Sequence, residues 1–395
     1  MSRKDIICVT MTTWEGDYMK TIVHMMSQLA KNHRVLFVDY PFTYKDVLTG
    51  ILKKSNAPVK RILGISKRLR KLTTRQGHEI YHLTLPPIFP SNWINDASSF
   101  QEVIMAQSHI IVRSICNAMQ KTGMTEPTVI NAFNPIIGLP MVGRLDESQL
   151  IYYCYDEIRA AQWCGKHGGL MEDEFLQLAD QVIVTSEGLK DTKSLHNPHT
   201  TLVKNGVDFD LFHQAYFPDR FRRQRKVIGY TGSLDFRLDY DLLAFLAALH
   251  PEFDFHFVGR ITDPNAEKKL GQFQNVTFFG ARQPNDLPLL MQAFDLGIIP
   301  FVKNEFTKNI YPLKINEYLA AGLPVVSTDF APLIDFEKHI LIGKDHEEIQ
   351  SGVVRSLAND YQAEAERRIE IARSNDWSVR AIQVEEVLNN QPQYV

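Results

Sequence analysis

Long apolar segments are missing from this sequence, because no run approaches the roughly 20 residues that a membrane-spanning helix needs. Cysteine is scarce, since only four are present and none forms a C-x-x-C pair or a zinc-ligand spacing. The chain also lacks a G-x-G-x-x-G segment and any repeat at solenoid periods. These absences argue against a membrane-spanning helix, a zinc site, a dinucleotide-dependent dehydrogenase and a repeat protein.

The residues that are present indicate a globular protein of more than one domain. A length of 395 residues predicts two or three domains, and the composition is 44% hydrophobic and 23% charged. The amino terminus leads directly into a strand-like run without a signal peptide, and Cys8 and Cys154 lie in apolar runs typical of reduced core cysteines. We therefore expect a cytoplasmic protein.

Positive charge is concentrated in residues 45–75, which hold ten basic residues and one acidic residue, Asp46. Leucine and isoleucine are interleaved with these charges, so the segment is basic and amphipathic. Such a segment can lie on an anionic membrane surface, here the inner face of the plasma membrane. A solvated insertion is the alternative interpretation. Nucleic acid is not an expected partner, because no aromatic stacking set or known binding motif accompanies the charge.

Strand-like and helix-like segments alternate from the amino terminus onward. Residues 5–10 and 34–39 are predicted strands around a helix at about 20–31, which is the βαβ unit of a parallel sheet. Gly16 lies in the first strand-to-helix turn, where a backbone can approach a ligand closely. Further strands are predicted at residues 79–85, 128–132, 150–154 and 181–185, with helices at 96–120 and 171–179. We expect a Rossmann-like domain over residues 1–205, with residues 45–75 as its basic insertion, and a polar linker over 206–225.

A second alternation predicts another Rossmann-like domain over residues 226–375, followed by a C-terminal helix within 376–395. Its predicted strands are residues 226–230, 253–258, 276–279 and 296–299, and its predicted helices are 239–249 and 287–293. Three strands are followed by a glycine, namely Gly232, Gly259 and Gly280. Ligands bind at the carboxyl ends of parallel strands, so these turns indicate a nucleotide pocket. The expected fold class is α/β, with two doubly wound Rossmann-like domains facing a central cleft.

Residues 311–328 carry the most informative single pattern, which is a loop, a helix, a tight turn and a buried strand. The helix begins near Leu313 and Lys314, and the unpaired N–H groups of such a start can hold an anion. Glu317 lies in the middle of this helix beside its apolar stripe, where a carboxylate needs a specific reason to be. An ordinary surface glutamate on an αβ unit is the alternative interpretation.

With these motifs in order, the sequence resembles a retaining glycosyltransferase of the GT-B fold, in the large family-four (group 1) class. The resemblance is strongest over residues 228–328 and weakest at the first strand and Gly16. The segments that carry it are G-Y-T-G-S-L (229–234), F-V-G (257–259), F-D-L-G-I-I-P (294–300) and P-x-K-x-x-E-Y-L-A-A-G-x-P-V-V (312–326). Two segments of the first domain match the same class. They are Tyr155 and Asp156, which precede Glu157, and N-G-V-D (205–208).

The resemblance implies a role for each matching residue. Glu317 would accept hydrogen bonds from the donor ribose, the helix start at Leu313 and Lys314 would receive the diphosphate, and Arg237 would neutralise charge on the leaving group. Arg260, Ala281 and Arg282 would flank the base, although either arginine could instead be a solvated surface charge. The implied donor-binding set is Gly16, Gly232, Ser233, Arg237, Gly259, Arg260, Ala281, Arg282, Thr307, Leu313, Lys314 and Glu317, and the implied catalytic set is Asp156, Arg237, Asn309 and Glu317.

Two positions depart from the family's pattern. Asn309 stands eight residues before Glu317, where many members have a glutamate near the transferred sugar, so the identity of the sugar is open. Thr307 and Asn309 could still hydrogen-bond sugar hydroxyls. The strand that ends at Cys154 is followed by Tyr and Asp156, where many relatives have a histidine. Asp156 could orient the acceptor hydroxyl, or it could be a helix N-cap.

These implications predict a hexosyltransferase that moves a sugar from a UDP- or GDP-sugar to a hydroxyl acceptor with retention. The basic segment favours a lipid-linked or polysaccharide-precursor glycan as the acceptor. No cofactor besides the donor is expected, and no metal, because the D-x-D pairs at 208–210 and 239–241 are explained by helix capping. The alternatives are a GT-B sugar-nucleotide epimerase or phosphorylase and a non-catalytic GT-B subunit.

Overall fold

The computed structural model describes residues 3–15, 20–160, 164 and 166–390. They form two compact units, which we call unit 1 (described residues from 3–204 and 381–390) and unit 2 (residues 205–380). Within the described residues, the chain first passes from unit 1 to unit 2 at residues 204 and 205. It returns to unit 1 inside the last helix.

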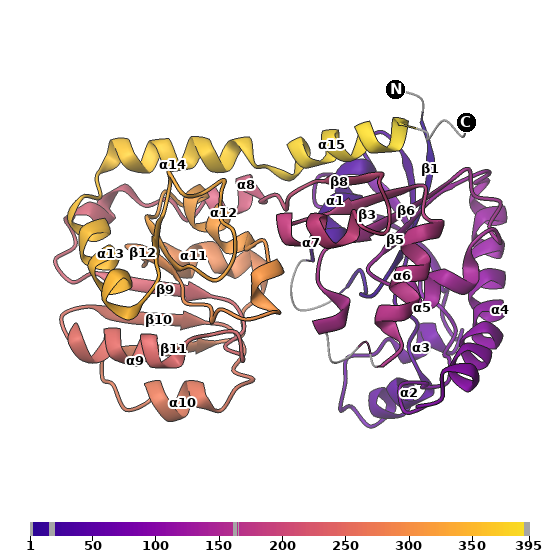
Figure 1. Ribbon diagram of the computed structural model, residues 1–395, viewed down its shortest axis with the longest axis horizontal. Helices are drawn as coiled ribbons and strands as arrows, with labels where there is room; N and C mark the ends of the chain where they lie inside the picture. The colour runs from indigo at the N-terminus through magenta and orange to yellow at the C-terminus, as the bar shows by residue number, and fades with distance from the viewer. Residues whose placement is uncertain (1–2, 16–19, 161–163, 165, 391–395) are drawn as a thin grey trace. The chain divides into compact units, whose positions relative to one another are not determined.

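Unit 1 is built on an eight-stranded sheet in the order β3-β4-β2-β1-β5-β6-β7-β8 (Figure 1). Its strands are β1 (Asp5–Thr10), β2 (Arg34–Val38), β3 (Leu69–Thr73), β4 (Glu79–Leu83), β5 (Thr128–Ala132), β6 (Gln149–Cys154), β7 (Gln181–Val184) and β8 (Thr200–Leu202). The strands pair in parallel except for β3, which runs antiparallel to β4 at the edge. Every residue of β5 and β6 is buried, as expected for strands covered on both faces.

The helices of unit 1 surround this sheet and bury one apolar core with it. They are α1 (Thr21–Leu29), α2 (Tyr44–Ile51), α3 (Val59–Ile62), α4 (Ala97–Thr122), α5 (Pro135–Gly138), α6 (Gly168–Leu178) and α7 (Glu187–Lys193), with the 3-10 turns η1 (Leu139–Met141) and η2 (Ile158–Ala160). The long helix α4 begins where Asp96 accepts a hydrogen bond from the Ser99 N–H and ends at Gly123 with a φ of 68°. Both ends follow from ordinary capping chemistry.

Unit 2 contains a six-stranded, fully parallel sheet in the order β11-β10-β9-β12-β13-β14 (Figure 1). Its strands are β9 (Val227–Thr231), β10 (Asp254–Val258), β11 (Val276–Gly280), β12 (Leu296–Ile299), β13 (Val325–Thr328) and β14 (Leu341–Gly343). The strand order reverses between β9 and β12. In open α/β sheets such a switch point is where ligands bind.

Two groups of helices pack against this sheet. The first comprises α8 (Phe209–His213), α11 (Leu287–Met291), α12 (Leu313–Ala320) and α14 (Gln362–Ser374), and the second comprises α9 (Tyr240–Leu249), α10 (Asn265–Leu270) and α13 (His346–Ala358). Because parallel strands are joined by right-handed crossovers, the reversal of strand order places the two groups on opposite faces. Short 3-10 turns, η4 (Pro218–Arg222), η5 (Pro284–Asp286) and η6 (Thr307–Asn309), join these elements. The last helix, α15 (Trp377–Asn389), begins in unit 2 and continues into unit 1.

Two sequence expectations are corrected. Residues 206–225 are not a linker, because α8 and η4 lie there and Phe209, Leu211 and Phe212 are buried in the core of unit 2. The basic residues 45–75 are not an insertion outside the sheet, since they contain α2, α3 and the edge strand β3. The predicted C-terminal helix is present as α15, and from Ala381 onward it belongs to unit 1.

The predicted strands and the helices at 20–31, 96–120, 171–179, 239–249 and 287–293 are present with shifts of a few residues at their ends. The antiparallel β3, the short β14 and the helices α13 and α14 had no counterpart in the sequence expectation. None of the helices in the described part of the chain is long and apolar enough to cross a membrane.

Candidate functional site

The switch point of unit 2 brings two glycine turns into contact. Gly232 follows β9 with a φ of 136°, a conformation that favours glycine, and its N–H donates to the Val258 carbonyl over 2.8 Å. A Cβ on Gly259, after β10, would lie 1.8 Å from the Gly232 carbonyl oxygen. Both glycines are therefore required by the local packing. The two turns therefore place backbone groups at the carboxyl end of the unit 2 sheet.

Helix α12 starts beside these turns. Its N-cap residue is Pro312, and no side chain caps the first turn. Lys314 is half-buried and reaches back to Gly232, where an added Cβ would lie 2.5 Å from its Cε and 2.9 Å from its Nζ. The same Nζ lies 5.6 Å from the ring centre of Tyr230. The helix N-terminus and the Lys314 ammonium group thus lie beside the same turn, an arrangement that suits the binding of phosphate.

Glu317 lies one turn after Lys314 on the same helix and is half-buried. Desolvation by the surrounding protein raises the pKa of Glu317, and the positive charge of Lys314 opposes that shift. Desolvation also lowers the pKa of Lys314, with Arg237 adding to the effect and Glu317 opposing it. Lys314, Glu317 and Arg237 are therefore electrostatically coupled. Among the described residues, the Glu317 carboxylate has no hydrogen-bond or ion-pair partner, so it can accept hydrogen bonds from a ligand.

Arg237 is less available than the sequence suggested. Its Nε and one terminal nitrogen hold the two carboxylate oxygens of Asp235 at 2.8 and 2.6 Å, and its guanidinium lies 5.6 Å from the Phe301 ring centre. Both side chains sit in the turn between β9 and α9 and are partly exposed. Asp235 was missed by the sequence analysis, although its spacing of two residues from Arg237 is a signal of such a pair.

Thr307 and Asn309 are buried in the loop that follows β12. The Thr307 hydroxyl donates to the Val302 carbonyl over 2.6 Å, and Asn309 Nδ2 donates to the Glu305 carbonyl over 3.3 Å. Both side chains therefore hold the loop that precedes α12. Phe306 from this loop packs on the exposed Phe236 from the β9 turn, with ring centres 5.4 Å apart. This aromatic pair was also missed, because its members come from distant segments.

The remaining expected residues are dispersed around the site. Ser233 is half-buried next to Gly232, whereas the side chains of Arg260, Ala281 and Arg282 are exposed after β10 and β11. Gly16 lies outside the described residues. Asp208 and Asp239 cap α8 and α9 by accepting hydrogen bonds from Leu211 N–H and Leu242 N–H, which confirms the capping interpretation. Within the described residues, no group of three or more His, Cys, Asp or Glu side chains is arranged to hold a metal ion.

In unit 1, Asp156 follows β6 at the carboxyl end of the sheet. Its Oδ1 accepts a hydrogen bond of 2.9 Å from the N–H of the next residue, Glu157. The carboxylate is half-buried and lies just before η2. The structure therefore places Asp156 in a turn at the ligand-binding edge of a parallel sheet.

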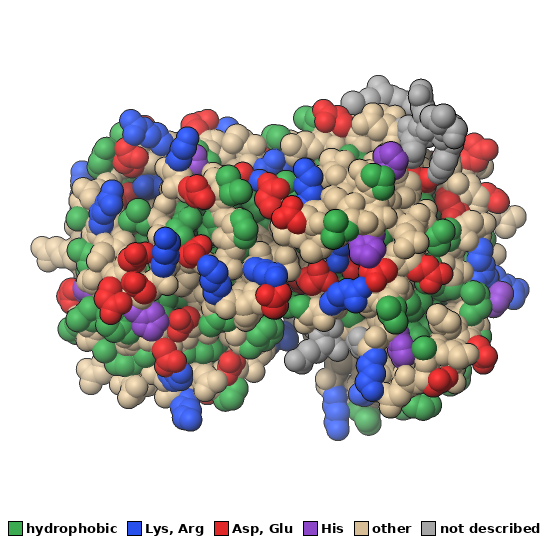
Figure 2. Space-filling model, viewed as in Figure 1, with side chains coloured by type: hydrophobic (Ala, Val, Ile, Leu, Met, Phe, Trp, Pro, Cys, Tyr) green, Lys and Arg blue, Asp and Glu red, His purple; other side chains and the backbone are tan. Residues whose placement is uncertain are grey.

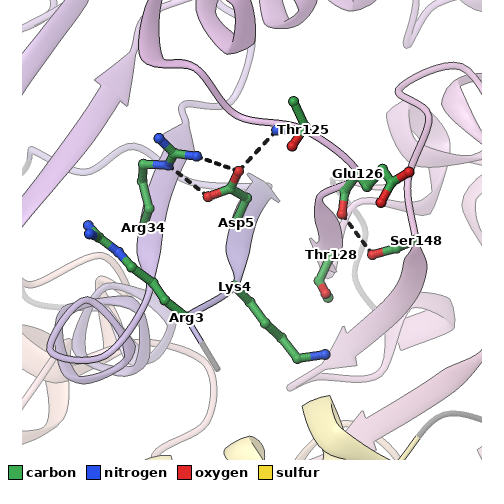
Figure 3. Close-up of a pocket in the computed structure, with 8 residues that line it drawn as sticks. All are labelled: Arg3, Lys4, Asp5, Arg34, Thr125, Glu126, Thr128 and Ser148. Atoms are coloured by element: carbon green, nitrogen blue, oxygen red, sulfur yellow. Dashed lines mark hydrogen bonds and ion pairs between the residues drawn. The ribbon is translucent and has the colours of Figure 1, made fainter. Parts of the chain in front are cut away.

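Unit 1 also has a hollow of about 390 Å³ at the opposite edge of its sheet (Figure 3). Arg34 there holds both oxygens of Asp5 at 2.7 and 2.6 Å, and Thr125 N–H donates to the same carboxylate over 3.0 Å (Figure 3). The amino ends of β1, β2 and β5 form this edge. It is separate from Asp156, and its Arg34 and Asp5 are paired with each other.

Residues 225–359 match the family described as glycosyl transferases group 1. A Bacillus subtilis (strain 168) protein named for glycosyltransfer in teichuronic acid biosynthesis, TuaH, is 29% identical over 273 residues, which are 61% of this chain and 67% of that protein.

Solved structures match almost the whole chain. Sucrose-phosphate synthase from Thermosynechococcus elongatus aligns with a TM-score of 0.70 at 16% identity and 98% coverage of both chains. Trehalose 6-phosphate synthase from Burkholderia multivorans gives 0.66 at 11% identity, again covering 98% of both. HepE from Anabaena, solved with UDP and glucose, gives 0.63 at 14% identity and covers 98% of this chain and 99% of its own. The fold is GT-B, and together with the sequence matches it supports the group 1 glycosyltransferase family.

Proposed function

We propose that this protein is a glycosyltransferase in which unit 2 binds a nucleoside-diphosphate sugar and unit 1 binds a hydroxyl acceptor. The observation that carries this proposal is the arrangement of Lys314 and Glu317 on α12 beside Gly232. It combines a helix N-terminus without a side-chain cap, an ammonium group and a carboxylate with no protein partner among the described residues. The helix N-terminus and the ammonium group can bind a diphosphate. The carboxylate can accept hydrogen bonds from the two hydroxyls of a ribose.

The proposed reaction breaks the bond between the sugar C1 and the β-phosphate oxygen, and that oxygen keeps the electron pair. A new bond forms between C1 and the acceptor oxygen, and the acceptor proton passes to the departing phosphate. Lys314 and Arg237 would offset the charge that develops on the leaving group, so we propose that no metal ion is needed. Asp156 would accept a hydrogen bond from the acceptor hydroxyl and orient it. We also propose retention of the anomeric configuration.

The donor and acceptor classes follow from relatives. HepE was solved with UDP and glucose, which supports a UDP-sugar as the first donor to test, with a GDP-sugar as the alternative. TuaH is named for teichuronic acid biosynthesis, which supports a cell-surface polysaccharide or its lipid-linked precursor as acceptor. No further cofactor is proposed.

The site assignment is tested by nucleoside diphosphate binding. We expect calorimetry to show binding of UDP or GDP by the wild type, with affinity at least 10-fold weaker in Lys314→Met and in Glu317→Gln, since hydrogen bonds to charged groups contribute about 1.5–3 kcal/mol. Lys338→Met is the matched control, because Lys338 is exposed in the same unit and outside the site. Its affinity should equal that of the wild type.

Two results would contradict the proposal. Binding of neither UDP nor GDP by the wild type would exclude the donor site. Unchanged affinity in both site variants would show that the nucleotide binds elsewhere in the chain. Release of nucleoside diphosphate that depends on added glycolipid acceptor would separate a transferase from an epimerase, which needs only the nucleotide sugar.

We further propose that unit 1 rests on an anionic membrane through a patch that we call the α2–α3 surface. Its apolar members are more than half exposed, and its lysines are exposed. Basic and hydrophobic side chains lie at the surface over α2 in Figure 2. It comprises Lys45, Leu48, Ile51, Leu52, Lys53, Lys54, Lys60, Ile65 and Lys67. Phe89 and Trp93 are exposed as well, and Phe89 packs on Tyr44 of α2 with ring centres 4.8 Å apart. Basic, aliphatic and aromatic side chains together suit the interface of an anionic bilayer.

A further inference from the structure

A buried charged cluster in unit 1 is not used by the site described above. We call it the Lys193 cluster, and it comprises Tyr152 of β6, Glu157 after β6, Glu172 of α6 and Lys193 of α7. Each of the four residues is at least nine-tenths buried, and Glu172 and Tyr152 are fully buried. Ionisable groups are seldom buried to this extent unless they are paired.

Lys193 is the centre of the cluster. Its Nζ lies 2.8 Å from Glu172 Oε2 and 3.1 and 3.2 Å from the two carboxylate oxygens of Glu157. The Tyr152 hydroxyl donates to Glu172 Oε1 over 2.8 Å. Two carboxylates therefore share one ammonium group. One carboxylate would be enough to neutralise Lys193, so the second calls for a separate explanation.

A contribution to the stability of the folded protein does not explain the second carboxylate. Removing ions from water costs about as much as their pairing returns, and a buried ion pair is weak evidence for stability. A second buried carboxylate adds a further desolvation cost without adding a counter-charge. The second carboxylate is therefore explained by the segment of the chain that it holds in place.

Glu157 connects the cluster to Asp156. Its N–H donates to Asp156 Oδ1 over 2.9 Å, and its own Oε1 accepts from Arg159 N–H over 3.1 Å. On the other side of the turn, the Cys154 thiol donates to the Asp156 carbonyl over 3.3 Å. Through these bonds the anchored Glu157 side chain fixes both the turn and the direction of the Asp156 carboxylate. Among the described residues, Glu172 reaches the turn only through the Cys154 thiol, whose Sγ lies 3.6 Å from Glu172 Oε1, and no hydrogen bond joins it to Asp156 or Glu157.

We infer that Glu157 and Lys193 are positioning residues that hold the Asp156 carboxylate in the orientation required by the acceptor hydroxyl. The inference rests on the proposed function, because it assigns a purpose to Asp156 in the transfer step. Misplacement of an orienting group by about 1 Å can cost on the order of 100-fold in rate. The effect of losing Glu157 should therefore appear in turnover and leave nucleotide affinity unchanged.

The test compares Glu157→Gln with Glu172→Gln. Each change removes one of the two carboxylates that share Lys193 and leaves the other as its partner, so both proteins should fold. Turnover is measured as release of UDP from a UDP-sugar, or of GDP from a GDP-sugar, with a glycolipid extract as acceptor. UDP or GDP affinity is measured in parallel. We expect turnover of Glu157→Gln to fall about 10- to 100-fold, with turnover of Glu172→Gln within about two-fold of wild type.

Thermal unfolding distinguishes positioning from a purely structural role, since a structural role predicts that activity follows the loss of stability in both variants. Equal turnover in the two variants would overturn the inference, as would a loss in Glu157→Gln that is matched by loss of nucleotide affinity. If the wild type binds UDP or GDP but transfers no sugar, the inference is overturned, because Asp156 then has no transfer step in which to act. A wild type that binds neither nucleotide fails at the proposed function itself.

Discussion

At the scale of single residues, the proposed donor site of unit 2 depends on Lys314 and Glu317. They are one helical turn apart, half-buried and coupled in charge, with their pKa values moved toward each other by desolvation. Neither side chain has a hydrogen bond or ion pair to another described residue, and the Lys314 ammonium group lies beside Gly232. A ligand that carries both negative charge and hydroxyl groups would satisfy both side chains.

The pH dependence of nucleotide binding follows from these two shifts. Glu317 must be ionised to accept ribose hydrogen bonds, and its pKa is raised above the usual 4.5, so affinity should fall as pH decreases through that raised value. Lys314 must be protonated, and its pKa is lowered below 10.5, so affinity should fall as pH increases through that lowered value. We expect a bell-shaped profile in calorimetry of UDP or GDP.

The variant Glu317→Gln isolates the acidic limb of this profile. The nucleotide's own phosphate titration is common to both proteins, so it cancels when their profiles are compared. The variant should lose the part of the acidic limb that belongs to Glu317. Identical acidic limbs in the two proteins would show that Glu317 does not contact the nucleotide.

At the scale of elements, Arg220 shows why residues 206–225 are structural. The side chain is 1% exposed and lies in η4, where it donates to the Gly322 carbonyl over 2.8 Å and pairs with Asp360 at 2.5 Å. Gly322 ends α12, and Asp360 precedes α14. A single buried guanidinium therefore joins the supposed linker to two elements next to the site.

We expect Arg220→Met to lower the free energy of unfolding by about 1–3 kcal/mol, because it removes hydrogen bonds to buried groups while Arg368 still pairs with Asp360 and donates to the Gly322 carbonyl. Arg222→Met is the control, since Arg222 is 87% exposed and pairs only across one turn with Asp219. Its effect should stay below about 0.5 kcal/mol. Urea unfolding measures both, and equal values would mean that the buried contacts of Arg220 do not stabilise unit 2.

The α2–α3 surface is also an element-scale feature. Arg61 and Arg70 of the basic segment hold Glu15 in the β1–α1 loop, with Arg70 at 2.8 Å, and Arg68 donates to the Ile62 carbonyl over 2.8 Å. These contacts lower the pKa of Glu15 to about 2, chiefly through Arg61. Part of the positive charge that suggested a membrane segment is therefore used inside unit 1. The exposed lysines of the α2–α3 surface are the charges left for the proposed membrane contact.

We expect the wild type to co-sediment with phosphatidylglycerol vesicles at low salt. The triple variant Lys53→Glu, Lys54→Glu, Lys60→Glu should bind at least about 100-fold more weakly, because each lysine near the surface contributes about 1 kcal/mol to the binding free energy. A triple variant of the same net charge, Lys31→Glu, Lys121→Glu, Lys190→Glu, is the control, because those lysines are exposed elsewhere in unit 1. If both triple variants lose binding equally, net charge explains it and the α2–α3 surface is not the contact.

At the scale of the whole molecule, each unit has a large apolar core of its own among the described residues. A ligand that binds one native unit stabilises it by mass action, by about 2.7 kcal/mol at 100 times its dissociation constant. We therefore expect saturating UDP or GDP to slow amide hydrogen exchange in β9 and α12 of unit 2. Slower exchange confined to unit 1, with none in α12, would contradict the assignment of the donor site to unit 2.

The sequence by itself determined the elements around this site, because each depends on neighbouring residues. A helix start after Pro312, a glycine after each of β9 and β10, and buried valine and isoleucine strands are local patterns that predicted the two-domain α/β fold. The position of Glu317 within its helix followed from the same spacing, and the resemblance supplied its role.

Only the tertiary structure decided which side chains meet. Lys314 reaches Gly232 across the switch point, Arg220 is buried between α12 and α14, and Lys193 gathers two carboxylates from different segments. Each of these partners is far away in the chain, and no local pattern specifies a contact at such separation. Burial and charge pairing set these contacts when the chain folds, because an ion without a partner cannot enter the interior at acceptable cost.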